Sequence, residues 1–374
     1  MTDDGSAGPA NEVPPIIGID TAAYRIPLET PESDGTLSWS ATTLVVVSVR
    51  GGDETGVGYT YAPPAAAHII DDTLSQVVTG MNALAPGAAW SAMAHALRNQ
   101  GLRGPAAAAV SAVDVALWDL KARLLDVSLS TLLQGFHDSV PAYGSGGFTN
   151  FDDRELGAQL SAWAESGLPA VKIKVGSDPE DDQRRVAFAR RVIGDGLGLF
   201  VDGNGAFARK QALALAEDFA DNGVSWFEEP VSSDDLDGLR LLRDRAPAGM
   251  EIAAGEYGWD LTHFRDLLRA EAVDCLQADI TRCGGPTVLL RVGALCDAEN
   301  IDLSSHCAPQ LSAHALTGVW HRRHLEYFAD HVRIERLAFD GVLTPVDGAL
   351  HPDRTRPGHG LLLREEALEP YRIC

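Results

Sequence analysis

Lysine, paired cysteines, long apolar runs and excess positive charge are all scarce in this chain. The 374 residues carry 53 acidic and 30 basic side chains, which gives a formal net charge of −23. This balance disfavours nucleic acid and anionic membranes as partners, because both need clustered positive charge. No apolar run reaches the roughly 18–20 residues that span a bilayer, and the acidic start has no signal-peptide pattern. We therefore expect a cytoplasmic protein with a flexible tail at residues 1–15.

Cysteine usage points away from cross-linking. The five cysteines are odd in number and include no CxxC pair. A disulfide framework or a structural zinc site is therefore disfavoured, and we interpret most of these cysteines as small core residues. They are Cys275, Cys283, Cys296, Cys307 and Cys374.

The few lysines are informative because of where they stand. Only four occur, against 26 arginines, yet Lys172 and Lys174 lie two residues apart in the segment VKIK. Arginine stays protonated in proteins, whereas a buried lysine can lose its proton. The pair is therefore a candidate for proton chemistry.

The chain divides into two parts with different patterns of predicted strands and helices. Residues 16–135 show strand patterns followed by Ala- and Leu-rich helical patterns, typical of an α+β capping domain that residues 340–374 would complete. Over residues 136–339, eight short apolar runs alternate with amphipathic helical stretches, the eighth being VRIE at 332–335. Eight strand–helix units predict a (β/α)8 barrel of the modified TIM type.

Polar side chains end successive runs of this predicted barrel. They recur at steps of 23 to 29 residues, about one strand–helix unit each. The carboxyl ends of barrel strands meet at one face, where active sites of this fold lie, so these side chains should converge. They are Lys174, Asp202, Glu228, Glu256, Asp279, His306 and Glu335, with Lys172 beside the first.

Three of these residues suggest a metal. Asp202, Glu228 and Glu256 would bring three carboxylates together, and a hard divalent cation relieves their repulsion. Magnesium fits such oxygen ligands, and manganese would fit them too. Lys174 would flank the metal on one side and the Asp279–His306 pair on the other, an arrangement suited to removing a proton next to a carboxylate.

With these motifs in order, the sequence resembles the mandelate racemase subgroup of the enolase superfamily over almost its whole length. The resemblance implies a base at Lys174, an auxiliary charge at Lys172 that faces the substrate carboxylate, and a catalytic dyad of His306 and Asp279. In VDGN, FEEP and AAGE it implies the metal ligands Asp202, Glu228 and Glu256. It also implies substrate contacts at Asn204 and at Glu335, the last-strand acid.

In that family the capping domain supplies specificity. Its mobile loops would lie at about 31–39 and 51–61, with Trp39, Tyr59 and Tyr61 as possible substrate contacts. Two ambiguities stay open at this point. Glu229 could exchange roles with Glu228, although we prefer Glu228. The His321–His324 pair has a metal-like spacing but is interpreted as a solvated helix face.

The predicted reaction is dehydration of an acid sugar, an aldonate or aldarate, to a 2-keto-3-deoxy acid. Lys174 or His306 would take the α-proton, and His306 would protonate the departing 3-hydroxyl. Racemisation of a 2-hydroxy acid and cycloisomerisation of an anhydro-sugar acid remain alternatives. A non-catalytic sugar-acid binding protein is the alternative from another class. The resemblance also implies a homo-oligomer, from dimer to octamer.

Overall fold

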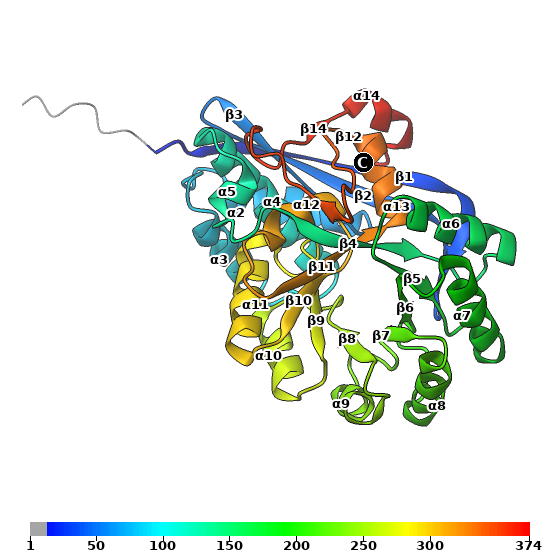
Figure 1. Cartoon of the computed structure of the whole chain (residues 1–374). Coiled ribbons are helices and arrows are strands. Elements are labelled where there is room, and N and C mark those ends of the chain that lie inside the picture. Colours follow the sequence, from blue (N-terminus) through cyan, green and yellow to red (C-terminus); the bar gives the residue numbers. More distant parts are fainter. Residues whose placement is uncertain (1–12) are drawn as a thin grey trace, which may run out of the picture.

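The computed structural model describes residues 13–374, so most of the predicted tail lies outside the described residues. The first structural unit is an antiparallel sheet in the order β1-β2-β3. The β-branched residues of the central strand favour an extended chain, and its run from Leu44 to Val47 is buried on both faces of the sheet. In Figure 1 the two longest strands run across the upper part of the molecule, above the barrel. The strands are β1 (Ile16–Ser33), β2 (Ser38–Gly51) and β3 (Glu54–Tyr61).

This sheet packs on one long helix. The helix, α4 (Pro105–Leu124), lies so close to β3 that side chains are excluded from two strand positions. A Cβ atom at Gly56 or Gly58 would lie 2.2 Å from a helix carbonyl oxygen, of Ala116 or Ala112 respectively. The alanine-rich helix and the strand can therefore pack this closely because the strand has glycine at these two positions. The other cap helices are α1 (Ala65–Ile69), a π-helix (Ile70–Leu74), α2 (Ser75–Val78), α3 (Pro86–Ala96) and α5 (Leu129–Leu132).

The second unit is a closed ring of eight parallel strands. They are hydrogen-bonded in chain order from β4 to β11, and β11 pairs with β4 to close the barrel. The (β/α)8 prediction is confirmed, and Figure 1 shows the helices arranged outside this ring. The strands are β4 (Val140–Gly146), β5 (Ala170–Lys174), β6 (Gly198–Asp202), β7 (Val224–Glu228), β8 (Glu251–Ala254), β9 (Cys275–Ala278), β10 (Asp302–Ser305) and β11 (Arg322–Phe328).

Most helices that follow the strands bury one face, whereas α12 is buried along its whole length. Among residues 13–374, no helix combines the length and the apolar character needed to cross a bilayer. The helices are α6 (Asp153–Glu165), α7 (Pro179–Ile193), α8 (Arg209–Ala220), α9 (Leu236–Arg245), α10 (Leu261–Arg269), α11 (Gly285–Glu299), α12 (Pro309–Leu316) and α13 (Ala329–Ala338).

The predicted position of the eighth strand is wrong. Residues 332–335 lie in helix α13, and the closing strand is β11, ten residues earlier in the chain. The strand was hidden because it begins with the polar residues Arg322, Arg323 and His324. Arg323 is paired with Glu251 at the start of β8 and with Asp302 at the start of β10, so its charge is accommodated there. The His321–His324 pair accordingly lies at the start of β11 and not on a helix face.

The C-terminal segment returns to the cap. The backbone N–H of Ile373 donates to the carbonyl of Ala23, and the N–H of Ala23 donates to the carbonyl of Cys374, both at 2.9 Å. The exact domain boundaries stay predictions. The remaining elements are β12 (Phe339–Asp340), β13 (Ala349–Leu350), β14 (Leu362–Leu363), α14 (Glu365–Leu368) and a 3-10 turn (Glu369–Tyr371).

Candidate active site

Three carboxylates converge at the carboxyl-end rim of the barrel. Asp202 and Glu228 are the last residues of β6 and β7 and stand opposite each other in the ladder, while Glu256 follows β8. One oxygen from each residue lies within 4.8 Å of the others, and all three side chains are buried. Parallel strands in register thus bring together residues that are 54 positions apart in the chain.

Two lysines neutralise this cluster from the neighbouring strand β5. The Lys174 Nζ lies 2.5 Å from Asp202, and the fully buried Lys172 Nζ lies 2.5 Å from Glu228 and 3.5 Å from Asp202. Burial alone would raise the pKa of Asp202, but the two ammonium groups hold it below its usual value. Burial and the Lys172 charge lower the pKa of Lys174, but the carboxylates of Asp202, Glu256 and Glu326 together raise it, and the net shift is upward.

The cluster has the properties of a site for a hard divalent cation. Glu256 Oε2 and Glu229 Oε1 are buried, and neither accepts a hydrogen bond from residues 13–374. Burial, reinforced by the Glu256 charge, raises the pKa of Glu229. Carboxylate oxygens that accept no hydrogen bond, beside a purely oxygen donor set, are what Mg2+ or Mn2+ would satisfy. Of the adjacent pair, Glu228 contributes the oxygen that meets Asp202 and Glu256, as the sequence analysis preferred.

A histidine–aspartate pair lies against the far end of the cluster. His306 Nδ1 lies 2.8 Å from Asp279 Oδ2, and His306 Nε2 lies 3.2 Å from Glu256 Oε2. Thr281 holds the other Asp279 oxygen with its N–H and its hydroxyl, each at 2.7 Å. Burial lowers the pKa of His306, but Glu256, Glu326 and Asp279 raise it overall. The aspartate fixes the imidazole so that Nε2 faces the carboxylate cluster.

The acid at the end of the last strand is Glu326, not the predicted Glu335. Glu326 lies near the end of β11, 2.8 Å from Lys172 Nζ and 3.7 Å from His306 Nε2. Burial would raise its pKa, but Lys172 and His306 bring it well below the usual value. Glu335 points from helix α13 toward the cap, where its carboxylate accepts a 2.6 Å hydrogen bond from Tyr59. The misplaced eighth strand explains this error.

The cap closes the site as a pocket of about 560 Å³. Trp39 and Tyr61 from the cap line it together with Asn204, so their predicted contacts with substrate stay predictions, whereas Tyr59 is buried behind them. The Tyr61 ring stacks on the His331 ring with the two ring centroids 3.4 Å apart. The Tyr61 hydroxyl has no hydrogen-bond partner among the described residues. The predicted mobile loop at 51–61 is mostly strand β3. The second predicted loop is mostly the paired ends of β1 and β2, with a short turn between them.

Two family profiles match the chain. "Mandelate racemase / muconate lactonizing enzyme, N-terminal domain" matches residues 17–134, and "Enolase C-terminal domain-like" matches residues 155–367. The chain belongs to the mandelate racemase branch of the enolase superfamily. The resemblance inferred from the motifs is therefore confirmed, and the charged rim described above is that of an enzyme of this superfamily.

Three similar proteins illustrate the range within this family. A curated relative, the 3,6-anhydro-alpha-L-galactonate cycloisomerase of Streptomyces coelicolor, is 33% identical and covers 94% of this chain and 97% of its own. A mandelate racemase/muconate lactonizing enzyme-like structure from Rubrobacter xylanophilus is 52% identical, with a TM-score of 0.94 over 96% of this chain and 100% of its own. An L-talarate dehydratase from Polaromonas sp. JS666, complexed with Mg and L-glucarate, is 27% identical, with a TM-score of 0.88 over 96% and 98%.

Among the pocket residues that were missed from the sequence, three lie beside the catalytic groups. Glu326 was hidden by the misplaced strand, although it follows His306 by 20 residues, close to the usual step. Arg282, three residues after Asp279, lies 3.4 Å from that aspartate and 3.5 Å from Glu256. Cys307 was interpreted as core, and only the structure shows it lining the pocket.

Proposed function

We propose that this enzyme removes the α-proton of a sugar acid and expels the 3-hydroxyl, giving a 2-keto-3-deoxy acid. One observation carries the proposal. Lys174 touches the carboxylate cluster at Asp202, and His306 touches it at Glu256, so two proton-transfer groups face one site from two ends. The pocket of about 560 Å³ is also large enough for a compact, polar sugar acid.

Asp202, Glu228 and Glu256 would hold magnesium. When bound, the ion would supply positive charge that stabilises the negative charge developing on the substrate carboxylate. The Polaromonas dehydratase, with Mg and L-glucarate bound, supports this pairing of ion and substrate class. Lys172 bridges Glu228 and Glu326 and so fixes one ligand and one pocket carboxylate in place. We assign Lys172 this positioning role together with its fixed charge.

The protons can be followed through the reaction. Lys174 or His306 takes the α-proton, according to the configuration at carbon 2. The carbon–oxygen bond at carbon 3 then breaks, and His306, fixed by Asp279, gives a proton to the departing hydroxyl so that water leaves. The enol product takes up a proton at carbon 3 and becomes the 2-keto acid. Asn204, Trp39, Tyr61 and Glu326 would orient the substrate from the pocket walls.

A second reaction shares these steps. If the leaving oxygen belongs to an anhydro ring, the same elimination opens the ring without releasing water. The cycloisomerase of Streptomyces coelicolor, 33% identical over almost the whole chain, favours this as the second candidate. Lyase and isomerase then differ only in the leaving group, which the pocket walls and not the metal cluster would select.

The test is a screen of aldonates, aldarates and anhydro-sugar acids with Mg2+ in deuterated water. Formation of a 2-keto acid, detected with semicarbazide, is the expected result, and mass spectrometry shows whether water has been lost. If deuterium enters carbon 2 and no keto product forms, the reaction is racemisation and not elimination. The variants Lys174→Ala and His306→Asn identify the base for each stereoisomer. Absence of both product and α-proton exchange across the screen would overturn the proposal.

A further inference from the structure

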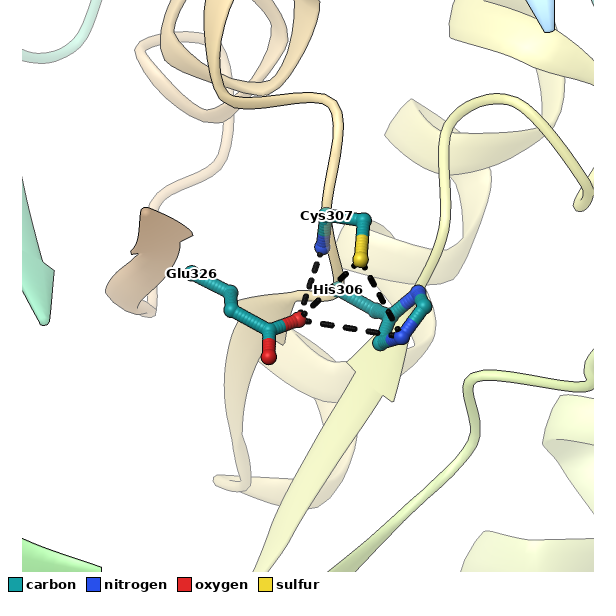
Figure 2. Close-up of side chains that lie close together, drawn as sticks. All are labelled: His306, Cys307 and Glu326. Atoms are coloured by element: carbon teal, nitrogen blue, oxygen red, sulfur yellow. Dashed lines mark hydrogen bonds and ion pairs between the residues drawn. The ribbon is translucent and has the colours of Figure 1, made fainter. Parts of the chain in front are cut away.

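A second cluster of metal-binding atoms lies beside the carboxylate cluster. It combines an imidazole nitrogen, a thiol sulfur and a carboxylate oxygen, from His306, Cys307 and Glu326. Figure 2 shows the three side chains converging from the end of β10 and from β11. Within residues 13–374, this trio and the three carboxylates are the groups of at least three such residues whose ligand atoms lie within 4.8 Å of one another.

The distances within the trio fit a tetrahedral ion. Cys307 Sγ lies 3.3 Å from His306 Nε2 and 3.4 Å from Glu326 Oε2, and Nε2 lies 3.7 Å from Oε2. With Zn–N, Zn–S and Zn–O bonds of roughly 2.0–2.3 Å, the edges of a tetrahedral zinc site are about 3.4–3.6 Å. The three atoms therefore already stand close to one face of such a tetrahedron.

The surroundings hold each ligand atom in place. Asp279 holds the Nδ1 side of His306, which leaves Nε2 for an ion, and such carboxylate–histidine pairs are usual behind zinc. Glu326 Oε1 is held by Lys172 and by the Ser145 hydroxyl at 2.6 Å, and Oε2, which accepts the Cys307 backbone N–H at 3.0 Å, faces the imidazole and the thiol. Cys307 has a backbone φ of +49°, a conformation that side-chain-bearing residues rarely adopt.

The chemistry of the trio distinguishes it from the neighbouring site. Sulfur and nitrogen donors suit zinc, whereas magnesium prefers an all-oxygen set. A thiolate and a carboxylate together balance the charge of a zinc ion. All three residues line the 560 Å³ pocket, so the fourth position of the tetrahedron would be open to water or substrate.

We propose that His306, Cys307 and Glu326 form an inhibitory zinc site with ligands different from the carboxylates of Asp202, Glu228 and Glu256. The two sites adjoin, because His306 Nε2 also lies 3.2 Å from Glu256 Oε2. Zinc on Nε2 occupies the nitrogen that would otherwise carry the proton, so the occupied enzyme is inactive. The inhibition rests on the proposed function, but zinc binding does not. A failure of either one can therefore be recognised separately.

The experiment measures metal binding to the full-length protein in excess Mg2+. Equilibrium dialysis with Zn2+, followed by elemental analysis, should give one zinc per chain without loss of magnesium. Co2+ used as a spectroscopic probe should give a thiolate-to-cobalt charge-transfer band. The Cys307→Ser variant should bind zinc at least about 100-fold more weakly, because even partners behind the ligands contribute 10–100-fold. The band should vanish in the same variant.

The matched control is Cys374→Ser, which removes the exposed thiol and should change neither measurement. The cobalt spectrum of the wild-type protein requires no variant, so a folding defect in Cys307→Ser would not prevent the test. Equal zinc affinity in wild type and Cys307→Ser would overturn the proposal. So would the loss of one magnesium for each zinc gained, because that would place zinc at the three carboxylates.

Discussion

The two walls of the pocket are built on different principles. The barrel rim carries carboxylates and ammonium groups that are buried and bonded to one another, such as Lys172 with Glu228 and Glu326. The cap wall places the rings of Trp39 and Tyr61 among mostly small, uncharged side chains, and the buried Tyr61 hydroxyl has no hydrogen-bond partner in the described chain. The rim is thus preorganised for chemistry, while the cap wall is free to contact different substrates. Substitutions in the two walls should therefore change different kinetic constants.

The largest effect is expected at the rim. Lys174→Ala removes the proposed base and should lower kcat by about 10²–10⁴-fold for substrates whose α-proton faces it. Lys210→Ala is the matched control, because Lys210 is exposed on helix α8. Steady-state rates of 2-keto acid formation would check this. An unchanged kcat in Lys174→Ala would remove the chemical distinction drawn between the two walls.

Substitutions at the two ends of strand β8 should have different effects on Mg2+ affinity. Glu256→Gln, at the carboxyl end of β8, should weaken Mg2+ at least about 100-fold, because losing a ligand exceeds the 10–100-fold effect of outer partners. Glu251→Gln, at the amino end, breaks a partly exposed ion pair with Arg323 and should cost up to about 1 kcal/mol of stability. Calorimetric titration with Mg2+ separates the two outcomes. Equal Mg2+ affinity in both variants would contradict the assignment of Glu256.

The contrast between the walls also explains what the sequence could predict. Asp202, Glu228 and Glu256 could be predicted as a group because each lies at or just after the carboxyl end of a strand, so one strand–helix unit sets their spacing and the barrel brings them together. The barrel fold could be predicted from the same regular alternation of strand and helix patterns. The apolar pattern is hidden at β11 by Arg322, Arg323 and His324, and Glu326 was missed with this strand.

Other features of the site have no counterpart in sequence spacing. Tyr61 lines the pocket because of the geometry of a hairpin, whereas Tyr59 does not line it. The sequence around the two tyrosines does not show which of them reaches the pocket. Cys307 faces the pocket because of a left-handed backbone conformation directly after His306. Neither a hairpin's reach nor a single positive φ at a non-glycine residue can be derived from residue periodicity.

A moderate effect is expected at the cap wall. Tyr61→Phe keeps the ring that stacks on His331 but removes the hydroxyl. The variant would lose one hydrogen bond to the substrate, worth roughly 0.5–1.5 kcal/mol. This loss should raise KM about 2–10-fold and leave kcat unchanged. Tyr59→Phe is the control, since its hydroxyl bonds to Glu335 behind the pocket and should affect stability alone. A fall in kcat with constant KM in Tyr61→Phe would instead assign this hydroxyl to the chemistry.

The smallest effect on catalysis is expected at Glu335, which lies behind the cap wall. Burial raises its pKa from 4.5 to about 8, so the folded protein favours the protonated acid. The resulting stabilisation is complete below pH 4.5 and is lost as the pH rises through about 8. Glu335→Gln has no such proton to lose and can still accept the Tyr59 hydrogen bond.

The stability of wild type relative to Glu335→Gln should therefore fall over this pH range, while kcat stays the same. Chemical denaturation at several pH values, with rates measured in parallel, checks both expectations. A parallel pH profile for the two proteins would show that the buried acid is ionised in the folded state. A drop in kcat would return Glu335 to the catalytic rim, where its position in the sequence first suggested it. Glu326 would then have to share the role of last-strand acid, and the division between a reactive rim and a contact-making cap would no longer follow the barrel's edge.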